Sequence, residues 1–160
     1  MARRPPLPPL NNAPALICTW FGAGRLPLVP GTWGSLAALP FAVFLDWLGG
    51  PWLLAAGCVV LFVLGVWATN RYLRVRGGGD PQDLVIDEVI GMSIALIGAP
   101  LELRDYALAV VLFRSFDILK FGPIGWAERR APGAYGVLLD DVIAGFFALL
   151  VLVVVRWIAA

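Results

Sequence analysis

Positions 52–69 read WLLAAGCVVLFVLGVWAT, eighteen residues without a charge. The hydrocarbon core of a bilayer is about 30 Å thick and takes about 20 apolar residues in a helix, so this stretch predicts a transmembrane helix. The composition of the whole chain supports this prediction, because 60% of the 160 residues are hydrophobic and only 14% are charged. A soluble domain is typically about 45–50% apolar and about 25% charged. The excess apolar surface therefore predicts an integral membrane protein.

Four further apolar segments flank this stretch and predict an all-α fold, an integral membrane helical bundle with about four to five membrane segments and short polar loops. They cover residues 36–48, 84–99, 105–120 and 136–158. Gly49-Gly50-Pro51 predicts a tight turn before 52–69, and residues 121–135 are expected to form a polar loop. Some of the shorter segments are expected to be tilted, kinked or partly outside the bilayer.

The proline-rich residues 1–14 predict a flexible cytoplasmic tail, and residues 15–160 predict a single membrane-embedded domain. The arginines indicate the orientation, because Lys and Arg are enriched in cytoplasmic loops. Most of them fall in the tail and in loops expected on the same side: Arg3, Arg4, Arg25, Arg71, Arg74, Arg76, Arg129 and Arg130. Only Arg104 and Arg156 fall on the other side, so the amino terminus is expected in the cytoplasm.

Charges interrupt three of the apolar segments, and this orientation puts all three interruptions at the cytoplasmic face. They are Asp87-Glu88, Asp140-Asp141 and the charged residues of FRSFDILK at 113–120. In that last stretch Arg114, Asp117 and Lys120 are spaced by three and share one face of a helix. Ionisable groups in membrane segments are costly and are often functional. Two alternatives stay open, namely solvated helix ends with an Arg114–Asp117 ion pair, or a functional site.

The residue types narrow the chemistry. Histidine is absent, and the chain has neither a Cys-x5-Arg loop nor an Asp-x-Asp-x-Thr motif, which excludes several phosphatase mechanisms. Asp87, Glu88, Asp117, Asp140 and Asp141 are the carboxylates that fit a hard-metal site for Mg²⁺, and Arg114 and Lys120 fit a phosphate clamp. This set predicts metal-assisted phosphoryl transfer on a lipid head group.

A cation- or proton-coupled membrane transporter that uses the same acids is the alternative, and a structural or regulatory subunit is a third class. Transport would favour acids near the middle of the bilayer, whereas these acids are predicted at one face. The chain has no basic run with interleaved aromatic residues, so a nucleic acid is not an expected partner.

Four motif regions follow one another along the chain: GAGRLP at 22–27 with PGTWGS at 30–35, IDEVIG at 86–91, FRSFDILK at 113–120 and LDDVIAG at 139–145. Together they resemble the phosphatidylglycerophosphatase A family. The resemblance implies a helical, magnesium-dependent, multi-pass enzyme of the bacterial inner membrane, with its active site facing the cytoplasm. It implies that a phospholipid substrate, phosphatidylglycerol phosphate, is hydrolysed to phosphatidylglycerol in phospholipid biosynthesis. Many members continue from the lysine with Pro-x-Pro, where this chain has Phe121-Gly122-Pro123.

The resemblance also implies which residues form the site. The matching charged positions are Asp87, Glu88, Arg114, Asp117, Lys120, Asp140 and Asp141, the small polar ones are Thr32 and Ser35, and Asp80 matches a frequent family aspartate. We expect metal ligands at Asp87, Glu88, Asp140 and Asp141, catalytic carboxylates at Asp87, Asp117 and Asp141, and substrate contacts from Arg114, Lys120, Thr32 and Ser35. Asp117 or Asp87 would activate or orient the attacking water. Thr32 or Ser35 can also cap the helix that begins near residue 30.

Overall fold

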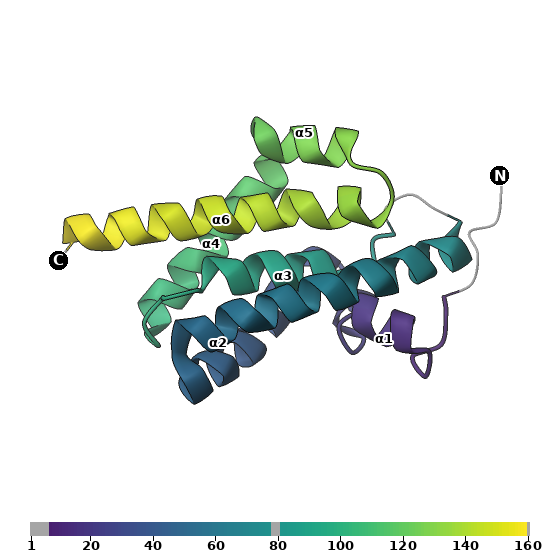
Figure 1. The fold of residues 1–160 in the computed structure, drawn as a ribbon, viewed down its shortest axis with the longest axis horizontal. Helices are drawn as coiled ribbons and strands as arrows, with labels where there is room; N and C mark the ends of the chain where they lie inside the picture. Colours follow the sequence, from purple (N-terminus) through teal and green to yellow (C-terminus); the bar gives the residue numbers. More distant parts are fainter. Residues whose placement is uncertain (1–6, 78–80, 160) are drawn as a thin grey trace.

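In the computed structural model, the charge-free stretch 52–69 lies in the longest helical element, α2 (Pro30–Arg76). This element consists of two arms, because Gly49 and Gly50 have non-helical φ and ψ angles. Gly50 has a φ of +68°, a conformation that favours glycine, and Pro51 suits the first turn of the second arm. The two arms fold back on each other (Figure 1). The predicted turn at Gly49-Gly50-Pro51 is therefore confirmed.

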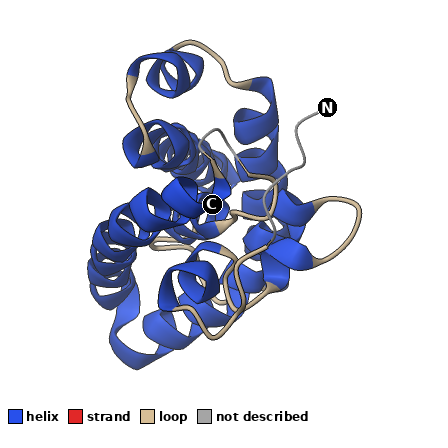
Figure 2. Ribbon diagram, turned by 90° about the vertical axis from the view of Figure 1, so that its right-hand side faces the viewer, coloured by secondary structure: helices blue, strands red, loops and turns tan. Residues whose placement is uncertain are grey.

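The structure describes residues 7–77 and 81–159, and it describes the side chains of all of these except residues 127–130. Helices are the only regular structure in these ranges (Figure 2), so the all-α prediction is confirmed. Besides α2 they are α1 (Ala13–Cys18), the short 3₁₀ helix η1 (Ala23–Arg25), α3 (Ile86–Ala95), α4 (Leu103–Leu119), α5 (Pro123–Arg130) and α6 (Ala134–Ala159).

The short helix α3 occupies the centre of the bundle. Every residue of α3 except Glu88 is buried, and α3 packs between α2 and α6 (Figure 1). Two glycines permit this packing, because a methyl group at Gly145 would clash with the backbone carbonyl of Gly91. Small residues at a helix crossing let the two backbones approach closely. The crossing fixes the beginning of α3 beside the beginning of α6.

Two of the described helical elements, α2 and α6, are long and apolar enough to cross a membrane. Their outer faces carry large exposed apolar side chains, among them Val63, Phe146 and Leu150. The predicted segment 84–99 instead forms α3, whose ten residues extend about 15 Å at about 1.5 Å per residue. Since a bilayer core is about 30 Å thick, α3 is too short to span it. The predicted count of four to five membrane segments is therefore not confirmed.

The segment 121–135, predicted to be a polar loop, contains the helix α5. Pro123 stands at its first position, where the missing N–H of proline leaves no helical hydrogen bond unmade. Ile124 is buried, and α5 packs against α6. Eight residues are too few for a helical period to emerge from a stretch rich in Gly, Pro and charge. The loop prediction was therefore wrong over residues 123–130.

Candidate active site

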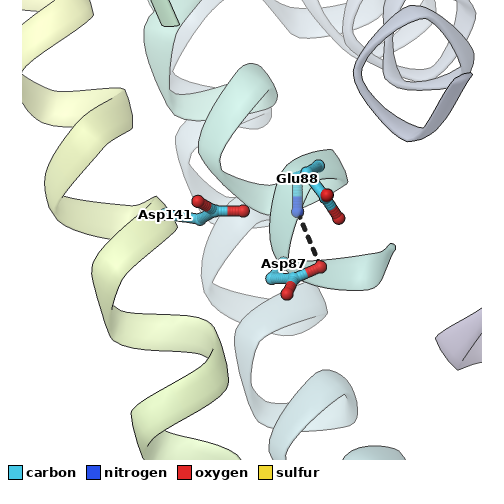
Figure 3. A group of neighbouring side chains, drawn as sticks. All are labelled: Asp87, Glu88 and Asp141. Carbon is cyan, nitrogen blue, oxygen red and sulfur yellow. Dashed lines mark hydrogen bonds between the residues drawn. The ribbon is translucent and has the colours of Figure 1, made fainter. Parts of the chain in front are cut away.

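The crossing of α3 and α6 brings together three acidic side chains, which we call the acidic cluster: Asp87, Glu88 and Asp141 (Figure 3). One oxygen from each lies within 4.8 Å of the others. Asp87 and Glu88 belong to the first turn of α3, where carboxylates are favoured by the helix dipole. The backbone N–H of Glu88 donates a hydrogen bond of 3.0 Å to Oδ1 of Asp87. Asp141 approaches from the facing helix.

Arg114, on a third helix, α4, contacts this cluster through its guanidinium. Nη1 of Arg114 lies 2.5 Å from Oδ2 of Asp117, one turn later on the same helix, and 3.8 Å from Oε1 of Glu88. Arg114 thus joins carboxylates of two different helices, and Asp117 also lies close to Asp141. Gly31, in the first turn of α2, provides the space, because a methyl group there would lie 3.0 Å from Nη1 of Arg114.

The two adjacent acids of α6 have different partners. Nζ of Lys120 donates a hydrogen bond of 2.8 Å to Oδ2 of Asp140, whereas Asp141 faces the acidic cluster. Adjacent residues on a helix point about 100° apart, which accounts for this division. Lys120 ends α4 in the left-handed conformation, with a φ of +45°. The structure thus places Asp140 in an ion pair and outside the group of three that the sequence assigned with it to a metal.

A cavity of about 600 Å³ opens beside the cluster. Its lining includes six of the charged residues expected at the site, namely Asp87, Glu88, Asp117, Lys120, Asp140 and Asp141. Two polar residues from the end of α2, Asn70 and Arg74, line it as well. The sequence indicated neither of them, because Asn70 interrupts no apolar run and Arg74 was assigned to the set of orienting positive charges.

Three expected substrate contacts are absent from the lining of this cavity. Arg114 instead contacts Glu88 and Asp117, as described above. Ser35 is buried, and its Oγ donates a hydrogen bond of 2.9 Å to the carbonyl oxygen of Gly31. Thr32 and Ser35 lie inside α2 and do not cap it, because the cap position is Val29, so that prediction was wrong. Asp80 lies outside the described residues.

The charges of the acidic cluster favour a cation. Burial raises the pKa of Glu88, while hydrogen bonding with Asp87 and the charge of Arg114 oppose this rise. Among the described residues, Oε2 of Glu88 has no hydrogen-bond partner and Asp141 forms no ion pair. Buried carboxylate oxygens without a partner are costly unless a cation neutralises them. Since Mg²⁺ takes oxygen ligands and is commonly held by a few carboxylates, the donor set fits this ion.

A second group of polar side chains, which we call the Asp83 cluster, lies just before α3. It consists of Asp83, Tyr72 and Arg76. The hydroxyl of Tyr72 donates a hydrogen bond to Oδ2 of Asp83, and Nη2 of Arg76 lies 3.1 Å from Oδ1. This cluster ties the loop that leads into Asp87 to the end of α2. The sequence did not indicate it, because its members come from a helix end and a loop with no shared period.

Comparison with known proteins identifies the family of this chain. The family model described as phosphatidylglycerophosphatase A matches residues 16–156. Phosphatidylglycerophosphatase A of Escherichia coli strain K12 is 38% identical over 138 residues, which cover 85% of this chain and 79% of that protein. The protein of the same name from Haemophilus influenzae is 33% identical over 149 residues, with 92% of this chain and 91% of that protein covered.

A third relative, from Bacteroides thetaiotaomicron, carries the provisional name phosphatidylinositol-3-phosphatase. It is 38% identical over 159 residues, which cover 91% of this chain and 94% of that protein. No solved structure gives a significant match. Because the family match extends over nearly the whole chain and the relatives are similar over most of their length, the chain belongs to the phosphatidylglycerophosphatase A family.

Proposed function

We propose that this protein hydrolyses the terminal phosphate monoester of phosphatidylglycerol phosphate, giving phosphatidylglycerol and inorganic phosphate. The observation that carries the proposal is the cavity beside the acidic cluster, in a chain of this family. The cavity combines carboxylates suited to a cation with cationic side chains suited to a phosphate. Neither the family match nor the named relatives support the transporter alternative.

The acidic cluster would hold Mg²⁺ through carboxylate oxygens of Asp87, Glu88 and Asp141. When bound, the ion would supply positive charge that offsets the negative charge of the phosphate in the transition state. Lys120 would donate a hydrogen bond to a phosphate oxygen, while Asp140 orients its ammonium group. This differs from the expected ligand role of Asp140, and the ion pair with Lys120 is the reason.

Asp117 would accept the proton of the attacking water, because it lines the cavity next to Asp141. Arg114 would orient Asp117 through their ion pair, and would fix Glu88 at the same time. We therefore assign Arg114 to positioning, and we assign no substrate contact to Thr32 or Ser35. Direct attack of water on phosphorus, with the lipid hydroxyl as leaving group, requires no covalent intermediate on the chain.

We place the site at the cytoplasmic face of a bacterial inner membrane, in a multi-pass protein. Three observations support this placement: the two helices long enough to span, the arginine-rich end of α2 beside the cavity, and the bacterial origin of the relatives. Arg104 and Arg156 line a different, smaller cavity formed by the beginning of α4 and the end of α6. With the acidic cluster at the cytoplasmic face, lipid head groups at the membrane surface would reach the cavity beside it.

The test is phosphate release from phosphatidylglycerol phosphate by the purified protein in detergent micelles. We expect turnover that EDTA abolishes and excess Mg²⁺ restores. Phosphatidylinositol 3-phosphate serves as the comparison substrate, because the Bacteroides relative is named for that activity. Absence of phosphate release from phosphatidylglycerol phosphate would contradict the proposed reaction, whereas full activity in EDTA would contradict only the metal.

A further inference from the structure

Three arginines stand at the end of α2, and the structure gives each a different environment. Arg76 forms an ion pair with Asp83, and the guanidinium of Arg71 lies 4.8 Å from the centre of the Trp67 ring. Arg74 has no hydrogen bond, ion pair or ring contact with any described residue, and it lines the cavity of the acidic cluster. Arg71 and Arg76 thus have partners inside the chain, whereas the side chain of Arg74 is exposed to solvent and open to a partner from outside.

The helix dipole alone does not account for Arg74. A cation in the last turn of a helix is stabilised by the dipole, but Arg76 stands in the same turn and already supplies such a cation. Arg74 lies four residues after Asn70, so the two share one face of α2, and both line the cavity. The position on this face, and not only the position in the turn, requires an explanation.

The cavity offers two regions of different chemistry. The acidic cluster and Lys120 would serve the phosphate that is removed, and Lys120 already has Asp140 as a partner. The lipid of the proposed function carries a second anion, the phosphodiester that joins its head group to the diacylglycerol. A guanidinium binds two oxygens of a phosphate at once through its planar fork. Among the described residues that line the cavity, Arg74 is the cation without a partner.

We propose that Arg74 binds the phosphodiester of a lipid head group that also carries a terminal phosphate, and thereby selects such lipids over those whose only phosphate is a monoester. The inference rests on the proposed function of the cavity. Its chemistry is common to phosphatidylglycerol phosphate and phosphatidylinositol 3-phosphate, which both carry a monoester and a diester. Phosphatidic acid, which has the monoester alone, lacks the group that Arg74 would bind.

The experiment compares Arg74→Gln with the matched control Arg71→Gln in the full-length protein in detergent micelles. The substrates are phosphatidylglycerol phosphate, phosphatidylinositol 3-phosphate and phosphatidic acid. A charge-assisted hydrogen bond contributes about 1.5–3 kcal/mol, so kcat/KM for the diester lipids should fall about 10-fold to 100-fold, chiefly through KM. For phosphatidic acid, kcat/KM should change less than about 2-fold, because this lipid has no diester for Arg74 to bind. Arg71→Gln should behave as the wild type on all three.

A second measurement does not depend on turnover of phosphatidic acid. Phosphatidylglycerol carries only the diester, and inorganic phosphate resembles only the monoester, so both are used as competitive inhibitors. Arg74→Gln should weaken inhibition by phosphatidylglycerol and leave inhibition by phosphate unchanged, and Arg74→Lys should fall between Gln and the wild type.

Either of two results would overturn the inference while the proposed function stands: unchanged kcat/KM for phosphatidylglycerol phosphate in Arg74→Gln, or an equal loss on all three lipids. Comparison of kcat/KM for phosphatidylglycerol phosphate and phosphatidylinositol 3-phosphate shows which of these two lipids is the substrate, since the wild type should prefer one of them. If the wild type hydrolyses neither diester lipid, the proposed function fails, and the role of Arg74 fails with it.

Discussion

The acidic cluster and the Asp83 cluster contain carboxylates only four residues apart in sequence, Asp83 and Asp87, yet their charges are balanced differently. Asp83 has both a guanidinium and a phenol as partners. In the acidic cluster, Glu88 lies 3.8 Å from its guanidinium, and Asp141 has no cation among the described residues. A buried carboxylate whose charge is balanced by a close cation stabilises a fold, whereas one whose charge is only partly balanced is costly. We therefore expect the Asp83 cluster to be structural and the acidic cluster to bind a ligand.

The largest effect should come from Asp141→Asn, which keeps the shape of the side chain and removes its charge. Turnover of phosphatidylglycerol phosphate should fall by more than about 100-fold, because a metal ligand and transition-state charge are lost together. In EDTA the Tm should stay the same or rise, because repulsion from the neighbouring carboxylates is removed.

The control for that variant is Asp105→Asn, a buried acid beside Arg104 in the smaller cavity. It should retain turnover. A fall in Tm for Asp141→Asn in EDTA would show that Asp141 is structural, and the contrast with Asp83 would then disappear.

The second effect concerns stability. Asp83→Asn should lower the free energy of unfolding by about 3 kcal/mol, because it removes the negative charge that faces the guanidinium of Arg76 in this largely buried ion pair. Tyr72→Phe, which removes only the hydroxyl, should cost about 1 kcal/mol. Thermal unfolding in detergent measures both, and turnover per folded molecule should stay within a few-fold of the wild type. Loss of turnover without loss of stability would place Asp83 in the reaction.

A third prediction tests the crossing that forms the acidic cluster. Gly145→Ala adds one methyl group against the carbonyl of Gly91, and overpacking of this kind costs about 1–3 kcal/mol. The displaced α6 should also shift Asp141, so Mg²⁺ should raise the Tm less than in the wild type. Titration of Tm against Mg²⁺ concentration checks this. An unchanged response to Mg²⁺ would mean that the cluster tolerates a wider crossing.

The smallest effect is a dependence on pH. Burial holds the pKa of Glu88 above its ordinary value of 4.5. The folded state then binds more protons than the unfolded state between these two pKa values. In EDTA, the stability that Glu88 contributes is therefore greatest below pH 4.5 and is lost as the pH rises through the raised pKa. Stabilisation by Mg²⁺ should increase over the same interval, because the ligands must be ionised.

Thermal unfolding measured against pH, once in EDTA and once in Mg²⁺, gives the slope of the stability and the slope of the Mg²⁺ stabilisation with pH. Glu88→Gln should flatten them, because the amide does not titrate. If the wild type and Glu88→Gln showed the same slopes, the pH dependence would belong to another group.

Local patterns made part of the site predictable. Asp87-Glu88 and Asp140-Asp141 stand out as paired charges inside apolar runs, and the gathering of such breaks at one end follows from antiparallel helices. That Asp140 and Asp141 have different partners was predictable, because adjacent residues on a helix point about 100° apart. Which of the two faces the acidic cluster was not predictable, because it depends on how α6 is rotated against α3. That rotation is set by Gly91 and Gly145, which lie far apart in sequence.

The fold, like the site, was predictable only in part. The turn at Gly49-Gly50-Pro51 follows from residues that disfavour a continuous helix, and the stretch 52–69 is apolar enough to indicate its environment. The segment that forms α3 is also largely apolar, apart from Asp87-Glu88, but lies inside the protein. Apolar side chains suit both a helix that faces lipid and a helix that faces other helices, so packing is needed to separate the two.

The contact between Gly91 and Gly145 also has a kinetic consequence. Helices in backbone contact cannot slide or separate without losing that contact, so α3 and α6 move as one rigid body that carries Asp87, Glu88 and Asp141. Asp117 and Lys120 belong to α4 and its end. The acidic cluster should therefore keep its shape while a lipid enters or leaves. Any change in the width of the cavity, and any limit that it sets on the rate of product release, should come from α4 or the end of α2, which also line the cavity.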